Sequence, residues 1–350
     1  MFSRERKNVV IGVDIGTSSI RAVAIERNNE LLTLQNYNEL YLGKYVGKEV
    51  GEYVNLSFSQ LEIALSDSIR ELKTDAGQVV LGIPSTMYIF KRVILPSYVV
   101  KSIKDSSALH NVVALEFKKV VPGVEILNYG ISFTTVQEDE NYIQYLVMAI
   151  KEDYANMLRN FISKTNKSFS IEPSIFGGIR TIPFETIQDN AVLINMEENN
   201  IDLVFLNSGK MVGVETINTG MNKIVFNIKN SLLIHYSEAR KILLDFDYKN
   251  TDNDNISDII KLSTINSIND MINIFNNYEI SYNIKYNKIY IGGSFASIKN
   301  INLFYEKNFN REIKIIDPFS RVFVPTVLEE MIKQNSNVFM NSLGLAINNV

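Results

Sequence analysis

A short turn at 14–19, between two largely apolar runs at 9–13 and 20–25, is the stretch of this sequence best equipped for chemistry. The residues of interest in it are Asp14, Gly16, Thr17, Ser18 and Ser19. Glycine lets backbone N–H groups approach a ligand closely, and hydroxyl groups add donors without bulk. A carboxylate at the end of a buried strand is suited to a hydrated hard cation. The turn therefore predicts a cradle for phosphate groups, with Asp14 holding Mg2+ through water.

The elements that must position this turn are two strands. Both flanking runs are rich in β-branched residues, which indicates a strand, a tight turn and a second strand. The plain alternative is a β-hairpin whose polar turn binds nothing. Features elsewhere in the chain are needed to choose between the two interpretations.

Length and composition limit the class of protein. The chain has 350 residues, which is more than one hydrophobic core usually serves, so two lobes are expected. A net charge of −4 argues against a duplex nucleic-acid partner. The absence of cysteine excludes disulfides, thiolate zinc sites and cysteine nucleophiles, and two histidines are too few for a histidine-rich metal site.

Hydropathy predicts a cytoplasmic protein. The apolar run after the N-terminal residues is interrupted by Asp14 and Gly16, so it is no signal peptide. No window approaches the roughly 18 uninterrupted apolar residues that a membrane-spanning helix needs. Any association with a membrane is therefore expected to depend on a partner.

The periodicity along the first half predicts a mixed sheet and a separate small module. After the opening hairpin we expect a strand at 31–37, a helix at 59–73 and a strand at 79–83. A compact α+β module then follows, with a helix at 103–120, strands at 126–136 and 142–150, and a helix at 151–164. Residues 171–180 are expected to be a turn entering a helix.

The stretch 192–206 repeats the layout of the opening hairpin. In an ungapped overlay Ile194 falls on Val13, Ile201 on Ile20, and Leu206 on Ile25. This internal duplication predicts two similar lobes that face each other across a cleft, each contributing one loop.

The second loop differs from the first in its chemistry. Asn195 stands at the position of Asp14, and Glu197 and Glu198 stand at those of Gly16 and Thr17. Two carboxylates near a γ-phosphate would repel it. We therefore expect impaired phosphate binding with little or no hydrolysis. The alternative is a solvated turn in a lobe that no longer contacts nucleotide at all.

A third candidate element is the strand at 288–291 with the small residues after it, Gly292, Gly293 and Ser294. This pattern resembles the adenosine motif of the actin–Hsp70–hexokinase superfamily, in which glycines after a strand allow a base and ribose to lie against the backbone. We also place Gly220 and Asn222, at the start of a predicted helical region, among the nucleotide-binding residues.

These motifs carry a family resemblance. The run from Gly12 to Val23 resembles the first phosphate loop of the actin–Hsp70–hexokinase superfamily. Within that superfamily it is most similar to the PilM family of type IV pilus assembly, and the FtsA family is next in similarity. Similarities to PilM continue at 116–122, 313–319 and 341–347. The segment 238–243 departs from the PilM pattern, because Arg240 and Leu243 replace an acid and a lysine. The chain stops after the helix at 341–347, where FtsA proteins continue to an amphipathic anchor.

The resemblance implies an α/β, actin-like (ribonuclease H-like, duplicated) two-lobed fold with an inserted α+β subdomain called 1C. It divides the chain into the first lobe at 1–95, subdomain 1C at 96–164, a return and link at 165–189, the second lobe at 190–220 and 286–335, a helical subdomain at 221–285, and a closing helix at 336–350.

The resemblance also implies a role. PilM-like proteins are scaffolds at the inner face of the cytoplasmic membrane, where they serve twitching motility. They bind the N-terminal cytoplasmic tail of a PilN-like membrane protein and connect it to the pilus motor ATPases. The sequence leaves open whether ATP or ADP with Mg2+ is bound, and whether the chain self-associates. The alternative function is an FtsA-like or bacterial-actin filament protein. A superfamily kinase would need a catalytic acid between the lobes, and no convincing candidate is present.

Overall fold

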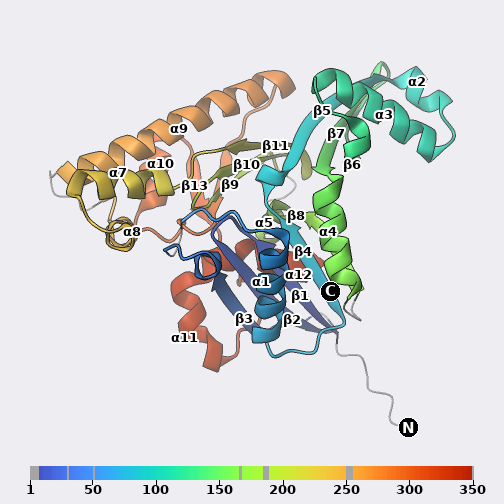
Figure 1. The fold of residues 1–350 in the computed structure, drawn as a ribbon. Helices are drawn as coiled ribbons and strands as arrows, with labels where there is room; N and C mark the ends of the chain where they lie inside the picture. Colours follow the sequence, from blue (N-terminus) through green and yellow to red (C-terminus); the bar gives the residue numbers. More distant parts are fainter. Residues whose placement is uncertain are drawn as a thin grey trace, which may run out of the picture.

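Two lobes and an inserted module make up the molecule (Figure 1). The structure, a computed structural model, describes residues 8–29, 31–49, 52–164, 168–183, 189–249 and 255–348. Each lobe is built on a mixed five-stranded sheet. The predicted α/β, actin-like, two-lobed fold is confirmed.

The first lobe has the strand order β3-β2-β1-β4-β8. The strands are β1 (Val9–Ile15), β2 (Ser19–Asn28), β3 (Leu31–Tyr41), β4 (Gln78–Ile83) and β8 (Ser168–Pro173). The first three pair antiparallel, whereas β4 lies parallel to both β1 and β8. Residues 171–173, expected to be a turn, belong to β8, and the predicted strand at 31–37 extends to Tyr41.

The second lobe repeats this sheet with the order β11-β10-β9-β12-β13. Its strands are β9 (Ala191–Met196), β10 (Ile201–Asn207), β11 (Lys210–Ile217), β12 (Lys288–Gly292) and β13 (Glu312–Ile315). Ile15 pairs with Ile20 in one hairpin, and Met196 pairs with Ile201 in the other. Both loops therefore have four residues between the closing pairs, which confirms the ungapped overlay residue by residue.

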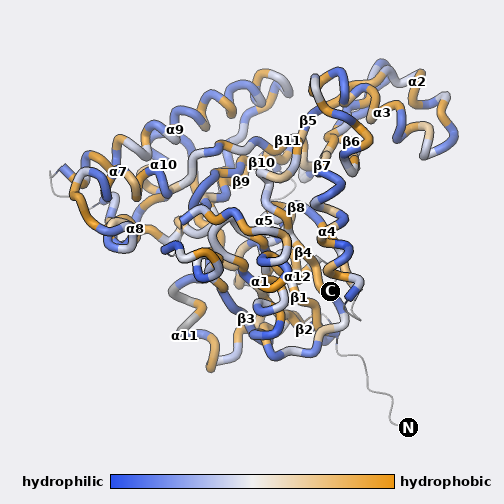
Figure 2. Tube along the Cα trace, in the orientation of Figure 1, coloured by the Kyte–Doolittle hydropathy of each residue, from blue (hydrophilic) through white to orange (hydrophobic). Residues whose placement is uncertain are grey.

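Helices cover the sheets on both sides. The first lobe carries α1 (Phe58–Glu71), with a capping box formed by Ser57 and Gln60, and α4 (Glu152–Ser163). The second lobe carries α7 (Asn222–Leu232), α8 (Tyr236–Leu244), α9 (Asn255–Tyr282) and α10 (Ile301–Phe309). Hydrophobic segments are prominent along the central strands in Figure 2, and their side chains form the main core clusters.

The inserted module contains a three-stranded sheet of order β5-β7-β6. Its elements are β5 (Tyr88–Pro96), α2 (Ser97–Ser102), α3 (Ser106–Val120), β6 (Tyr129–Glu138) and β7 (Tyr142–Lys151). The division expected from the family resemblance placed 88–95 in the first lobe. In the structure this segment is a strand of the inserted sheet, so the sheet begins before residue 96.

Two further assignments differ from expectation. The helix predicted at 103–120 is α3, and the shorter α2 precedes it. Helix α4, grouped with the module by sequence, buries Leu158 and Phe161 in the core cluster of the first lobe. Residues 165–167 and 184–188, within the predicted link at 165–189, lie outside the described residues.

Two helices pack against each other beside the sheets. They are α5 (Ser174–Thr181) and the closing helix α12 (Met340–Asn348), which also contacts β1, β2 and β4. A Cβ atom on Gly344 would lie 1.9 Å from the carbonyl oxygen of Gly177. The close crossing therefore requires glycine. The connecting helix α11 (Thr326–Asn335) precedes α12, and single 3-10 turns occur at Leu42–Tyr45, Ser85–Met87, Ile126–Asn128 and Ser336–Phe339.

Replacing Gly344 with alanine tests this crossing. Gly344→Ala is expected to lower the free energy of unfolding by about 1–3 kcal/mol or more, because the added methyl group meets backbone that cannot move aside. Urea denaturation monitored by circular dichroism measures the change. Ser66→Ala on the exposed face of α1 is the control and should alter stability by no more than about 0.5 kcal/mol.

Candidate functional site

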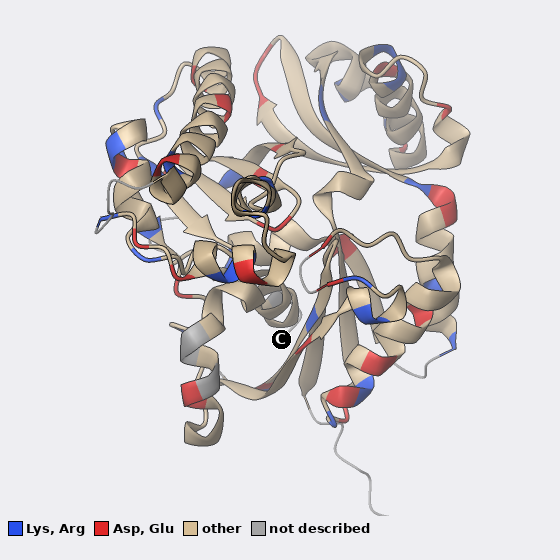
Figure 3. Cartoon of the chain, turned by 60° about the vertical axis from the view of Figure 1, so that its left-hand side comes forward, with Lys and Arg blue, Asp and Glu red and all other residues tan. Residues whose placement is uncertain are grey.

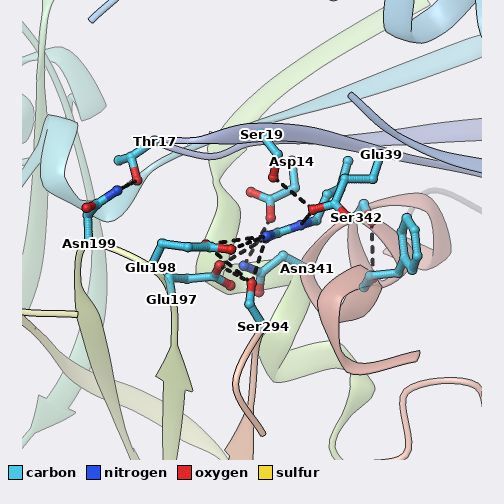
Figure 4. Close-up of polar contacts among 12 residues, drawn as sticks. Asp14, Thr17, Ser19, Glu39, Glu197, Glu198, Asn199, Ser294, Asn341 and Ser342 are labelled. Atoms are coloured by element: carbon cyan, nitrogen blue, oxygen red, sulfur yellow. Dashed lines mark hydrogen bonds and ion pairs between the residues drawn. The ribbon is translucent and has the colours of Figure 1, made fainter. Parts of the chain in front are cut away.

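The loops of the two hairpins meet at the junction of the lobes (Figure 4). Asn199 of the second loop donates a hydrogen bond of 2.8 Å to the hydroxyl of Thr17 in the first. Each loop closes on itself in the same way, through Gly16 N to Ser19 O at 2.9 Å and Glu197 N to Asn200 O at 3.0 Å. The duplication therefore brings two loops of matching geometry face to face.

Arg21 on β2 is the centre of the site. It is the cross-strand partner of Asp14, and its side chain is only 2% exposed. Its Nε donates to Glu39 on β3 at 2.9 Å, and its Nη1 donates to Glu197 at 2.9 Å. One cation of the first lobe thus binds a carboxylate from each lobe.

The second terminal nitrogen of Arg21 also faces the second lobe. Nη2 lies 3.3 Å from Glu198 and donates to the hydroxyl of Ser294 at 2.7 Å. Ser294 in turn donates to Glu197 at 2.8 Å. The guanidinium nitrogens Nε, Nη1 and Nη2 therefore all have a protein partner.

Of the two glutamates of the second loop, Glu198 is buried and Glu197 is largely shielded from solvent. The side chain of Glu198 is 4% exposed and that of Glu197 is 14% exposed. The interpretation of this loop as a solvated turn is therefore wrong. Removing one partner from a buried ion pair leaves an uncompensated charge and typically costs about 3–5 kcal/mol. The two lobes are accordingly coupled through these carboxylates and Arg21.

Burial and crowding of like charges shift the titration of the acids. Burial raises the pKa of Glu197 to about 8; Arg21 opposes the shift, whereas Glu198 and Asp14 add to it. For Glu39, burial is outweighed by Arg21 and by hydrogen bonds from Tyr41 and Ser19, so its pKa is lowered. Glu39 is therefore ionised and acts as the counter-ion of Arg21 within the first lobe.

Asp14 lies behind this network. It is 4% exposed and accepts a hydrogen bond from Asn341 on α12 at 3.4 Å. Burial raises the pKa of Asp14 against the opposing effects of Arg21, Ser174 and Asn341. Among the described residues no group of three or more acidic or histidine side chains could hold a metal ion. Mg2+ binding through water on Asp14 stays a prediction.

The other residues of the predicted phosphate cradle have protein partners. Ser19 donates to Glu39 at 3.0 Å, and the Ser18 carbonyl accepts from Leu42 at 2.9 Å. Thr17 is engaged by Asn199, as described above. The first loop thus keeps the predicted geometry, but two of its hydroxyls, on Thr17 and Ser19, bind protein groups.

The remaining predicted nucleotide-binding residues pack around the second loop. Added Cβ atoms on Gly220 and Gly293 would lie 2.4 Å from the Glu198 carbonyl and 2.5 Å from Asn195 Oδ1, and Gly293 has a φ of +90°. Gly292 lies against Met340, where a Cβ would meet the sulfur at 2.1 Å. Asn222 donates to Asn199 at 2.9 Å. Their role in nucleotide binding stays a prediction. Gly220, Gly293 and Asn222 contact the second loop or the end of the strand before it, whereas Gly292 packs against the closing helix.

Sequence reasoning missed Arg21 and Glu39 as site residues. The signal was present, because Arg21 is a lone charge between apolar neighbours on a strand, and a fully buried charge is rarely left unpaired. Which acid lay opposite depended on the pairing of β2 with β3, which places Glu39 across from Arg21. Arg240, a departure noted in the sequence, lies 3.6 Å from Glu198.

A second candidate site is a groove between the first lobe and the inserted module. The edge strands β8 and β6 both contribute to it, together with β7 and α4. The cavity has a volume of about 570 Å3, and its apolar lining residues include Tyr88, Ile131, Met148, Ile162, Phe169 and Phe176. Hereafter this cavity is called the β6–β8 groove.

Charged residues mark the wall and rim of the β6–β8 groove. Glu172 forms a bidentate pair with Arg180, with distances of 2.6 and 2.8 Å. Arg159 pairs with Glu152 at 2.6 Å. Elsewhere positive and negative segments are interspersed over the surface, as Figure 3 shows. The groove is therefore distinguished by its apolar lining and its strand edges rather than by charge.

The duplicated lobes, the paired loops and the inserted module define an actin-like protein. The family model for the type IV pilus assembly protein PilM matches residues 12–350. The chain therefore belongs to the PilM family. A search of curated protein sequences found no match.

Solved structures agree with the fold. A chain of a "PilM-PilN type IV pilus biogenesis complex" aligns with a TM-score of 0.78 and 15% identity over 99% of both chains. The ethanolamine utilization protein EutJ from Carboxydothermus hydrogenoformans gives 0.56 and 12% identity over 99% of this chain and 93% of that one. MreB5 of Spiroplasma citri bound to ADP gives 0.56 and 13% over 96% and 94%. No helix among the described residues is long and apolar enough to cross a membrane.

The raised pKa of Glu197 predicts a dependence of stability on pH. The folded state holds this proton more tightly than the unfolded state, so the contribution is fully present below pH about 4.5 and is lost as the pH rises through about 8. Urea denaturation between pH 5.5 and 9 should show stability falling by up to about 1.4 kcal/mol per pH unit from this group.

Glu197→Gln should flatten that dependence, because the amide does not titrate. The charged groups facing Glu197 are Arg21, Glu198 and Asp14, and these are retained in the variant. Glu116→Gln on α3, distant from the site, is the control and should keep the wild-type slope. An equal slope in wild type and Glu197→Gln would contradict the assignment.

Proposed function

We propose that this protein is a scaffold of type IV pilus assembly that binds the N-terminal cytoplasmic tail of a PilN-like inner-membrane protein. The observation that carries the proposal is the β6–β8 groove, which is apolar and bordered by two edge strands. Membership of the PilM family and the solved PilM–PilN complex of the relative support the choice of partner. Through that partner the protein sits at the inner face of the membrane and connects to the motor ATPases.

The β6–β8 groove suits an extended peptide. An edge strand offers unpaired backbone groups, and a peptide that adds to it gains main-chain hydrogen bonds while alternate side chains enter pockets. Phe169 lies on β8 and Ile131 lies on β6, so apolar side chains of the peptide find contacts on both sides. The tail peptide would be held between the first lobe and the module.

A binding measurement tests this proposal. A labelled peptide matching the N-terminal cytoplasmic tail of a PilN-like single-pass membrane protein from the same genome should bind the wild type saturably in fluorescence anisotropy. Ser132→Arg introduces a long charged side chain on β6 into the groove and should weaken binding at least about tenfold. Thr134→Arg, two residues along the same strand and not lining the groove, should bind normally. Absence of binding to the wild type would overturn the proposal.

We further propose that the cleft between the loops is a degenerate ATP site with weak or absent hydrolysis. Glu197 and Glu198 stand where the first loop has glycine and threonine, and both carboxylates are directed at Arg21. Asn195 provides no carboxylate to match Asp14. The groups that would orient a water for attack on a γ-phosphate are therefore missing from the second loop as it is arranged.

Steady-state assays should show ATP turnover far below the ~1–10³ s⁻¹ typical of enzymes. Phosphate release measured with and without Mg2+ is the readout, and Asp14→Asn gives the background rate. Enzyme-like turnover that Asp14→Asn abolishes would overturn the scaffold interpretation. Nucleotide-dependent sedimentation would instead favour the filament alternative.

A further inference from the structure

The carboxylates of Glu197 and Glu198 lie on Arg21 in the manner of a bound anion. Arg21 emerges from the hairpin of the first loop, and both acids come from the facing loop of the other lobe. Nη1 to Glu197 and Nη2 to Glu198 span 2.9 and 3.3 Å. Guanidinium groups bind carboxylate and phosphate oxygens through the same fork of N–H donors.

We infer that Glu197 and Glu198 are an internal substitute for the phosphates of a nucleotide, holding the two lobes together through Arg21 without a ligand. The inference rests on the proposed degenerate cleft and gives it a mechanism. The cleft does not merely lack phosphate-binding groups. Its cation is occupied by the protein's own acidic side chains: Glu198 pairs with it as a carboxylate, and Glu197 accepts a hydrogen bond from Nη1 in either protonation state, so the anion site is closed.

The surroundings of the two acids fix them in this position. Ser294 on the Gly292–Gly293 turn bonds both Arg21 and Glu197, at 2.7 and 2.8 Å. Arg240 on α8 lies 3.6 Å from Glu198. The backbone of Glu198 is held as well, because Asn222 N donates to its carbonyl at 2.7 Å.

An incoming phosphate would have to displace these carboxylates from Arg21. Glu198 is almost fully buried, so its displaced charge would remain in the interior with a weaker partner. The same phosphate would also approach Asp14 behind Arg21. Occupation of Arg21 by Glu197 and Glu198 therefore excludes anions from the cleft more strongly than the loss of a phosphate-binding glycine alone would.

The first loop supplies the design for a variant that reopens the site. Glu197→Gly with Glu198→Thr gives the second loop the residues found at Gly16 and Thr17, removing both charge and bulk. Glu197→Gln with Glu198→Gln removes the charge and keeps the shape. Thermal denaturation by circular dichroism first shows that each variant is folded.

Isothermal titration with inorganic pyrophosphate and with Mg2+–ADP then tests the inference. The wild type should show no saturable binding of either ligand at concentrations up to about 1 mM, so that any Kd lies above about 1 mM. The Gly/Thr variant should bind at least about tenfold more tightly than that limit, with the Gln/Gln variant between the two. Adding Arg21→Gln to the Gly/Thr variant should abolish the gained binding.

Two results would overturn the inference. One is micromolar binding of pyrophosphate or Mg2+–ADP by the wild type. The other is a folded Gly/Thr variant that binds neither ligand better than the wild type. Both leave the peptide measurement at the β6–β8 groove unaffected, so failure here is distinguishable from failure of the proposed scaffold function.

Lobe separation gives a second readout. The chain has no cysteine, so spin labels at Ser66→Cys on α1 and Lys307→Cys on α10 report the distance between the lobes without interference. The ligand-free wild type should give one narrow distance distribution by pulsed electron resonance. The Gln/Gln variant should give a broader distribution, and an unchanged one would contradict the role of these acids in joining the lobes.

Discussion

The buried cation of Arg21 is the constraint on which the junction of the two lobes depends. A guanidinium that is 2% exposed must be neutralised nearby, and among the described residues of the first lobe Glu39 is the acid that pairs with it directly. The second lobe supplies Glu197 and Glu198, so the lobes cannot separate without leaving charge uncompensated. The contact between the two lobes is therefore stabilised by side chains of the protein itself.

This arrangement changes the meaning of the second loop. Considered next to a phosphate, two glutamates are a repulsive defect. Considered next to Arg21, the same carboxylates are the ligands of a cation, and Ser294 and Arg240 complete their surroundings. The residues that stand at the positions of Gly16 and Thr17 in the second copy thus have a structural role at the junction of the lobes.

The functional surface of the protein is consequently expected elsewhere. With Arg21 and the acidic side chains between the two loops, the β6–β8 groove is a place where the described residues offer both apolar contacts and strand edges. The groove lies between the first lobe and the module, so its width depends on how α4 and β5 attach the module to that lobe.

The sequence by itself determined the duplicated hairpins, the inserted module and the loss of Asp14 and Gly16 in the second copy. These follow from local periodicity and from residue types at matching positions, and pairing in the two hairpins agrees with the overlay. Only the tertiary structure decided that β5 belongs to the inserted sheet and that Glu197 and Glu198 face Arg21 rather than solvent. The physical reason is distance along the chain: Arg21 and Glu197 are 176 residues apart, and no local pattern specifies which buried charge a distant loop will meet.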